Sequence, residues 1–158
     1  MSFELVCRML EDRGVTVEQI AEIVHALQLP FNPNLTLQEC IESVESVLRK
    51  REVQYTLMTG IALDQLTEEK KLPEPLQTIL EKDHPLYGVD EILALGITNV
   101  YGSIGLTSFG YLDKLKMGVI GRLNQHGTGS VHTFLDDLVA GIAAAASARL
   151  AHQQEEWP

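Results

Sequence analysis

Apolar residues recur at intervals of three and four along most of the chain, the spacing that places them on one face of an α-helix. Residues 2–12 show this pattern and are followed by Gly14, a residue type that commonly ends helices. Thr16–Gln19 (TVEQ) and Thr36–Glu39 (TLQE) are capping-box motifs, in which the two end residues exchange side chain to backbone hydrogen bonds. They predict the starts of a second and a third helix, and Pro30 ends the second.

The middle of the chain continues the helical rhythm. Apolar residues over 51–66 prolong the pattern of the third helix, so the sequence predicts one long helix unless Gly60 interrupts it. Pro73 marks a break before a short helix at 75–82. Residues 88–100 are more uniformly apolar and predict a more buried helix.

The C-terminal third combines glycine-rich stretches with a long helix. Residues 101–110 (YGSIGLTSFG) hold three glycines and two serines and predict a loop. A short helix at 119–125 and a glycine-rich loop at 126–130 (HGTGS) are expected next. The last helix is expected over 133–152, capped by Thr133. Its small residues allow neighbouring helices to approach closely, so we expect it at the centre of the protein.

Together these elements predict an all-α fold, a compact single-domain multi-helix bundle with a central Gly/Ala-rich C-terminal helix. Within one domain spanning 1–158 we expect an N-terminal helical hairpin at 2–29, a core with acidic motifs at 82–150 and a frayed tail at 153–158. A helix rich in small residues can also serve a symmetric interface, so the sequence leaves a homo-oligomer open.

The composition fits one globular domain of ordinary size, with 158 residues, 45% hydrophobic and 22% charged. No apolar run reaches the roughly 20 residues that span a bilayer, and the N-terminus lacks the pattern of a signal peptide. Two cysteines, Cys7 and Cys40, are too few for a disulfide framework and are expected as reduced core residues. We therefore expect a cytoplasmic protein.

The charge is strongly acidic, because 12 basic residues face 22 acidic residues and give a net charge of −10. Nonspecific nucleic-acid binding and passive adhesion to an anionic membrane both need basic surface, so nucleic acid is excluded as a partner and membrane contact is at most peripheral. A phosphate-bearing ligand would be repelled by this field. Its binding would require a bound cation or a locally basic pocket.

Two pairs of adjacent acids, Asp90-Glu91 and Asp136-Asp137, begin two otherwise apolar helices. Each pair alone is explained by the preference of acids for helix N-termini. If the two helix starts meet, however, the carboxylates cannot all stay ionised in a low-dielectric site without a counter-cation. A hard cation such as Mg²⁺ or Mn²⁺ is the natural one, and it favours phosphate chemistry.

Three basic residues between the acidic pairs, Lys114, Lys116 and Arg122, are candidate ligands of the remaining phosphate oxygens. Asp64 is expected on the surface. One Glu-x-x-Glu element, Glu39 to Glu42, is of the kind used by all-α nucleotide pyrophosphohydrolases, although no second element follows it. Walker, GxSxG and CxxC motifs are absent from the sequence, so serine or cysteine nucleophilic catalysis has no local support.

Three ordered elements of the sequence resemble the phosphatidylglycerophosphatase A family. Residues 83–91 (DHPLYGVDE) correspond to its D-P-x-x-I-V-x-D-E element, and residues 111–117 (YLDKLKM) to F-F-D-x-x-K-P. Residues 129–141 (GSVHTFLDDLVAG) match G-x-x-x-M-L-D-D-x-x-A-G. The resemblance covers about residues 82–150 and is closest to the soluble, short-chain branch, some members of which are named low-temperature-requirement C proteins.

This resemblance implies an all-α enzyme that removes the terminal phosphate of phosphatidylglycerophosphate with Mg²⁺. It makes Asp90, Glu91, Asp136 and Asp137 the catalytic candidates and Lys116 a phosphate ligand. The metal candidates that it implies are Asp83, Asp90, Glu91, Asp113, Asp136 and Asp137.

The chain departs from the family pattern at Met117, where the family has proline, and at Gly110, where it has arginine. A phosphate-bearing small molecule therefore remains an alternative to a phosphate-bearing lipid. Two other functions also remain open, namely a nucleotide pyrophosphohydrolase and a non-enzymatic interaction or regulatory module in which the acids only cap helices.

Overall fold

The computed structural model describes residues 2–125 and 129–154, and every regular element in these two ranges is helical. The elements are α1 (Ser2–Asp12), α2 (Val17–Gln28), α3 (Leu37–Leu48), α4 (Arg51–Glu68), α5 (Leu76–Glu81), α6 (Val89–Thr98), the 3₁₀ turn η1 (Asn99–Tyr101), α7 (Gly102–Leu115), α8 (Val119–Leu123) and α9 (Leu135–Gln154). The all-α prediction is confirmed. Parts of the expected loop at 126–130 and of the expected tail at 153–158 lie outside the described residues.

Both capping boxes form as predicted. The amide of Gln19 donates to the Thr16 hydroxyl at 3.2 Å, and the Thr16 amide donates to the Gln19 side chain at 2.9 Å. Thr36 and Glu39 exchange the same two bonds at the start of α3. These local bonds satisfy amides that have no partner within the first helical turn, so the sequence alone is enough to locate both helix starts.

The chain breaks between α3 and α4 at Arg49 and Lys50, where Lys50 is extended. Gly60 does not interrupt the helix; it lies inside α4 and is buried. A methyl group at this position would collide with the Leu138 side chain of α9. The glycine therefore serves a close approach between two helices rather than a break.

The prediction of a loop at 101–110 is wrong, because these residues form η1 and most of α7. Phe109 and Leu112 are buried on the face of α7 that packs against α9. Burying two such side chains contributes roughly 3–6 kcal/mol, whereas three helical glycines cost about 3 kcal/mol. Tertiary packing is thus large enough to outweigh the low helix propensity of this segment.

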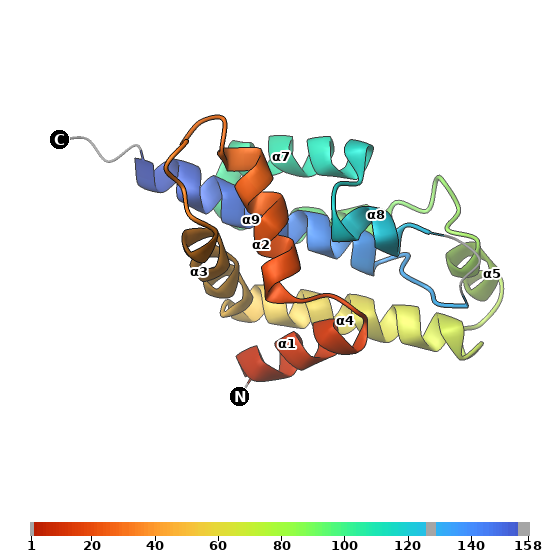
Figure 1. Ribbon diagram of the computed structural model, residues 1–158. Coiled ribbons are helices and arrows are strands. Elements are labelled where there is room, and N and C mark those ends of the chain that lie inside the picture. The colour runs from red at the N-terminus through yellow and green to blue at the C-terminus, as the bar shows by residue number, and fades with distance from the viewer. Residues whose placement is uncertain (1, 126–128, 155–158) are drawn as a thin grey trace.

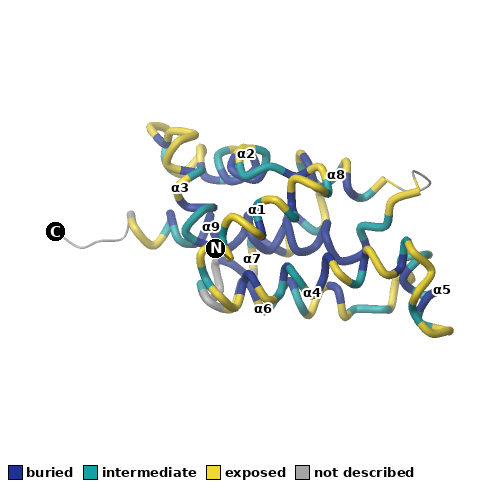
Figure 2. Tube along the Cα trace, turned by 90° about the horizontal axis from the view of Figure 1, so that it is seen from below, coloured by how far each residue is buried: buried dark blue, intermediate teal, exposed yellow. Residues whose placement is uncertain are grey.

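The last helix, α9, is central as predicted. It runs through the middle of the bundle with α2, α3, α4, α6, α7 and α8 packed around it (Figure 1). Every residue from Leu135 to Ala148 is buried, and the burial colours of Figure 2 show this continuous run. At Gly141, an added methyl group would lie 3.0 Å from the Ala94 carbonyl oxygen of α6. The small residues of α9 therefore bring α6 close to it.

The two N-terminal helices have different partners. Helix α1 packs against α4, while α2 packs against α3 and α9. The hairpin expected at 2–29 would have paired α1 with α2, but each of these helices makes its main contacts with other helices. Across the described part of the chain, no helix has the length and apolar character needed to traverse a bilayer.

Candidate active site

The two acidic pairs meet at one end of the bundle. Asp90 and Glu91 lie in the first turn of α6, and Asp136 and Asp137 lie in the first turn of α9. All four line one polar pocket of about 150 Å³, together with Asp83, Asp113 and Lys116. The structure therefore brings together every residue that the sequence marked as a metal candidate.

Helix capping accounts for only part of this arrangement. The Asp90 carboxylate accepts the Glu91 amide at 3.0 Å, and the Asp136 carboxylate accepts the Asp137 amide at 2.9 Å. Each bond uses one oxygen of one carboxylate, and the second oxygen of Asp136 lies 3.3 Å from the Lys116 ammonium. Asp90, Asp136 and Asp137 are nevertheless at most 7% exposed, an unusual burial for acids that would serve only as surface caps.

Lys116 is the internal counter-ion of this cluster. Its ammonium lies 2.9 Å from an Asp113 oxygen, 3.3 Å from Asp136 and 3.9 Å from Asp137. The residue ends α7 in a left-handed conformation, with φ 52° and ψ 53°, which is uncommon for a lysine. Although burial acts to lower the pKa of Lys116, the neighbouring carboxylates, Asp136 first, raise it above its ordinary value, so the ammonium stays charged.

The carboxyl groups are too crowded for all of them to be ionised. Burial, then the charge of Asp136 and hydrogen bonds to Asp113 and Asp90, raise the pKa of Asp137 far above its ordinary value. Burial also raises the pKa of Asp136, against the effect of Lys116. For Asp113, hydrogen bonds from Asp137 and Lys116 outweigh burial and lower the pKa. The raised pKa of Asp137 therefore favours its protonated form when no other cation is present.

The donor chemistry fits a hard divalent cation, because six carboxyl groups and one lysine line the pocket. The arrangement is not a ready-made coordination sphere, however. Among the residues that the structure describes, no three carboxylate, imidazole or thiolate side chains are grouped closely enough to hold a metal ion as they stand. The ammonium of Lys116 is held between three of the carboxylates instead.

The other two predicted phosphate ligands lie outside the pocket. Lys114 is exposed on α7 and does not line it. Arg122 donates to the Gly14 carbonyl at 2.5 Å and to the Gln19 side chain at 3.4 Å, so it links α8 to the start of α2. The Glu-x-x-Glu element of α3, Glu39 to Glu42, is exposed and likewise takes no part in the pocket.

The expectation that Asp64 lies on the surface is wrong, because this residue of α4 is completely buried. Its two carboxylate oxygens accept the backbone amides of Phe134 and Leu135, each at 3.0 Å. It thus caps the start of α9 from another helix, immediately before Asp136. Thr133, the predicted cap, instead donates its hydroxyl to the Leu80 carbonyl at 2.7 Å.

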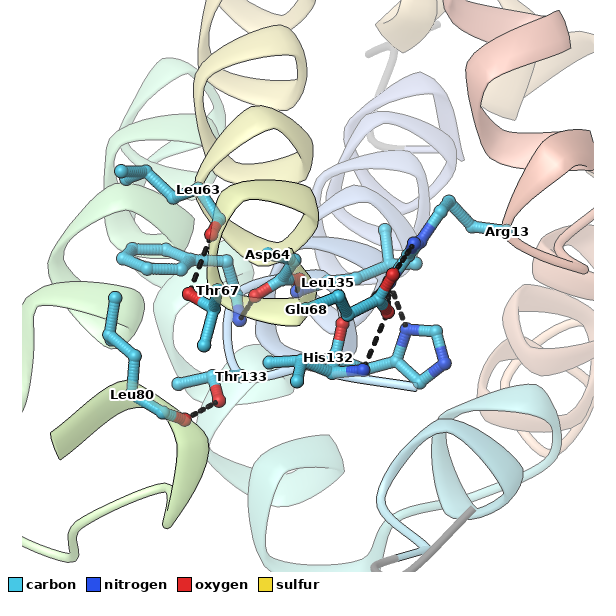
Figure 3. Close-up of polar contacts among 11 residues, drawn as sticks. Arg13, Leu63, Asp64, Thr67, Glu68, Leu80, His132, Thr133 and Leu135 are labelled. Carbon is cyan, nitrogen blue, oxygen red and sulfur yellow. Dashed lines mark hydrogen bonds and ion pairs between the residues drawn. The ribbon is translucent and has the colours of Figure 1, made fainter. Parts of the chain in front are cut away.

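A second, partly buried network holds the segment that leads into α9 (Figure 3). Arg13 makes a bidentate ion pair with Glu68 of α4, at 3.0 and 2.6 Å, and also donates to the Val131 carbonyl at 2.6 Å. Glu68 in turn accepts the Val131 amide at 2.6 Å, and Arg13 lies 3.3 Å from His132. The catalytic candidates on α9 are therefore positioned by residues from α4 and from the turn after α1.

The sequence did carry one signal for Asp64. It follows Leu57 and Ile61 at the spacing of one helical face, and both of those residues are fully buried. An acid on an apolar face indicates a buried polar role. Arg13 has no comparable signal, since it adjoins a turn and its partners are 55 and 118 residues away in the chain.

Comparison with known proteins identifies a matching family model, similar bacterial chains and a similar solved structure. The family model described as phosphatidylglycerophosphatase A matches residues 8–152. The chain is 59% identical to the uncharacterized protein YpjQ of Bacillus subtilis (strain 168), over 94% of this chain and 83% of that one. It is 58% identical to YutG of the same organism, over 91% and 87% of the two chains. The crystal structure of the low temperature requirement C protein from Listeria monocytogenes superposes with a TM-score of 0.96 at 52% identity and covers 98% of both chains.

Proposed function

The chain belongs to the phosphatidylglycerophosphatase A family, and we propose that it is a divalent-metal-dependent phosphatase acting on a phosphomonoester, with phosphatidylglycerophosphate as the expected lipid substrate. The observation that carries this proposal is the convergence of six carboxyl groups and Lys116 in one pocket built from the starts of α6 and α9 and the end of α7.

The metal candidates are Asp83, Asp90, Glu91, Asp113, Asp136 and Asp137, which offer the oxygen ligands that Mg²⁺ and Mn²⁺ prefer. When bound, such a cation supplies the positive charge that offsets the carboxylates and polarises a phosphate ester. Lys116 lies between three of these carboxylates. With a cation in the pocket to offset their charge, its ammonium would be able to donate to a phosphate oxygen.

Glu91 is the best candidate for accepting the proton of the attacking water. Hydrolysis forms a new bond from water oxygen to phosphorus and breaks the bond to the alcohol, so one group must take up a proton from the water while the departing alkoxide oxygen gains one. Glu91 is exposed at the mouth of the pocket, and burial together with Asp113 and Asp90 raises its pKa. A raised pKa makes a carboxylate a stronger base at neutral pH.

A second polar pocket of about 90 Å³ adjoins the first and shares Asp83, Asn124 and Asp136 with it. His132 and Thr133 also line this pocket. Its hydrogen-bonding side chains suit a hydroxylated group attached to the phosphate. We therefore expect the glycerol phosphate headgroup of the substrate to lie in this second pocket, next to the acidic residues.

The proposal is tested by phosphate release and by calorimetry on the same preparations. We expect the protein with Mg²⁺ or Mn²⁺ to release phosphate from phosphatidylglycerophosphate or a soluble phosphomonoester. We expect Glu91→Gln and Asp136→Asn to reduce the rate at least about 100-fold, the scale of general acid–base catalysis. Asp136→Asn should also weaken cation binding in calorimetry.

The matched control is Glu42→Gln, which removes an exposed carboxylate of α3 outside the pocket. It should leave both the rate and the cation affinity unchanged. If no phosphomonoester is hydrolysed and Asp136→Asn leaves cation affinity unchanged, the phosphatase proposal fails and a non-enzymatic module gains support. Release of pyrophosphate from nucleoside triphosphates would instead indicate a pyrophosphohydrolase.

A further inference from the structure

His132 lies beside the boundary between the two polar pockets. It lines the second pocket, and its backbone carbonyl accepts the Asp136 amide at 3.3 Å, so it stands one turn before that acid. Asp136 lines both pockets. An ester whose phosphate lies among the carboxylates, with its alcohol in the second pocket, therefore passes close to the His132 ring.

Arg13 fixes the position of the hydrogen on this ring. Its Nη2 atom lies 3.3 Å from Nδ1 of His132. A guanidinium has only donors and stays protonated in proteins, so Nδ1 is the acceptor and carries no hydrogen. A neutral imidazole with a bare Nδ1 carries its hydrogen on Nε2. Arg13 thus selects one tautomer of His132.

The arginine that makes this selection is itself held firmly. Its side chain is only 9% exposed, and it pairs with Glu68 and donates to the Val131 carbonyl. Burial, and then the charge of Arg13, lower the pKa of His132 against the effect of Glu68, which also favours the neutral ring. Figure 3 shows the Nδ1 side of the ring facing Arg13 and Glu68, with Nε2 on the far side.

Nε2–H is a donor without a protein partner. No described residue accepts a hydrogen bond from it, and it is not among the buried side-chain atoms that lack a partner. Acids that line the same pocket, Glu81, Asp83 and Asp136, repel a negative charge that develops on a departing alcohol oxygen. A neutral N–H aimed at that oxygen stabilises the charge instead.

We propose that His132 is a further catalytic residue, whose Nε2–H donates a hydrogen bond to the ester oxygen as it leaves phosphorus, and that Arg13 is its positioning residue. The inference rests on the proposed phosphatase function and adds the group that stabilises the leaving alcohol. As the bond from phosphorus to the ester oxygen breaks, its electron pair goes to that oxygen, while Nε2 keeps its proton. The proton that the alcohol gains balances the one that Glu91 takes from the attacking water.

Two substitutions of His132 separate the two ring nitrogens. The amide of asparagine reaches the position of Nδ1, so His132→Asn keeps an acceptor for Arg13 and loses the donor at Nε2. The amide of glutamine reaches the position of Nε2, so His132→Gln keeps the donor and loses the acceptor. His152→Asn is the matched control, because His152 is exposed near the end of α9 and lines neither polar pocket.

The rates are measured with glycerol 3-phosphate, whose alkoxide is a poor leaving group, and with 4-nitrophenyl phosphate, whose phenolate is a good one. We expect His132→Asn to lower kcat for glycerol 3-phosphate about 100-fold, the scale for loss of one such donor, and to affect 4-nitrophenyl phosphate much less. His132→Gln should recover most of the loss, and His152→Asn should change neither rate. Equal losses for both esters, or a slower rate for His132→Gln than for His132→Asn, would show that the ring acts only by supporting Arg13 and would overturn the inference.

Nuclear magnetic resonance tests the same inference without turnover, because long-range ¹H–¹⁵N spectra distinguish protonated from bare ring nitrogens. The signals of His132 are those that His132→Asn lacks. We expect a protonated Nε2 and a bare Nδ1 at neutral pH. In the slow Glu91→Gln protein with Mg²⁺, glycerol 3-phosphate should shift the Nε2 signal.

These spectra distinguish failure of the inference from failure of the proposed function. A protonated Nδ1, or an Nε2 signal that glycerol 3-phosphate does not move, would overturn the inference even in an active phosphatase. The expected spectra in a protein that hydrolyses no phosphomonoester would refute the phosphatase function and retain the contact between His132 and the ester.

Discussion

Asp64 caps the start of α9, the helix that carries the Asp136-Asp137 pair into the acidic site. It is completely buried, and it joins α4 to the amides of Phe134 and Leu135, directly before the Asp136-Asp137 pair. Burial raises its pKa to about 8, although the two amide donors and Arg13 act in the opposite direction. In the folded protein at neutral pH, the carboxyl group of Asp64 is therefore largely protonated.

This raised pKa predicts a pH-dependent contribution to stability. In the unfolded chain Asp64 titrates near its ordinary pKa of about 3.9. Between that value and about 8 folding takes up a proton, so the stability contributed by protonated Asp64 is fully present at low pH and is lost as pH rises through the folded pKa. We expect the free energy of unfolding of the unchanged protein, minus that of Asp64→Asn, to decrease steadily across this window.

Urea unfolding of both proteins at a series of pH values, without added metal, measures this difference. Taking the difference removes the contributions of titrating groups that the two proteins share. A difference that stays constant from about pH 4 to pH 8 would mean that Asp64 is ionised in the folded protein throughout.

At the scale of elements, helix α7 shows how a weak helix former is made helical by its neighbours. Gly110 lies on its exposed side, where an added methyl group would meet nothing within 4 Å. Gly121 of α8 is different, because a methyl group there would lie 2.6 Å from the Lys116 carbonyl oxygen. Gly110 therefore lowers the stability of α7, whereas Gly121 allows α8 to pack against the turn that contains Lys116.

These two glycines give a matched pair of predictions. Gly110→Ala should stabilise the protein by about 0.5–1 kcal/mol, because alanine favours a helix interior. Gly121→Ala should destabilise it by about 1–3 kcal/mol, since the obstacle is backbone and cannot easily move. It should also lower the phosphatase rate by displacing Lys116.

Thermal unfolding and phosphate release for both variants check this prediction. If Gly121→Ala has the stability and activity of Gly110→Ala, the close packing of α8 on Lys116 is not required for the position of the lysine.

At the scale of the whole molecule, the net charge of −10 opposes the approach of an anionic phosphate ester. Salt screens this repulsion, because the Debye length falls from about 30 Å at 0.01 M to about 8 Å at 0.15 M. We therefore expect kcat/KM for a soluble, doubly charged phosphomonoester to rise over this range of ionic strength. The measurement is a rate series at saturating Mg²⁺, with metal occupancy checked by calorimetry. A fall in kcat/KM at constant occupancy would show that the local positive charge at Lys116 controls substrate approach.

Elements whose causes are local could be predicted from the residues alone. Capping boxes at Thr16 and Thr36 depend on side chain and backbone groups within four residues, so both helix starts could be predicted. The small residues of α9 likewise predicted its central place, because their volume limits how closely helices approach. The acidic pairs could be recognised as candidate site residues because each lies at the start of an apolar helical pattern.

Which of these groups share a site depends on contacts between residues that lie far apart in the chain. Residues 101–110 become helical because Phe109 is buried against α9, a contact that glycine content cannot reveal. Lys116 joins the carboxylates while Arg122 turns to Gly14, although both lie between the acidic pairs in the sequence. Burial of Asp64 depends on α9, 70 residues further along the chain. Desolvation and charge pairing act through distance in space, and the local pattern of residues does not contain that distance.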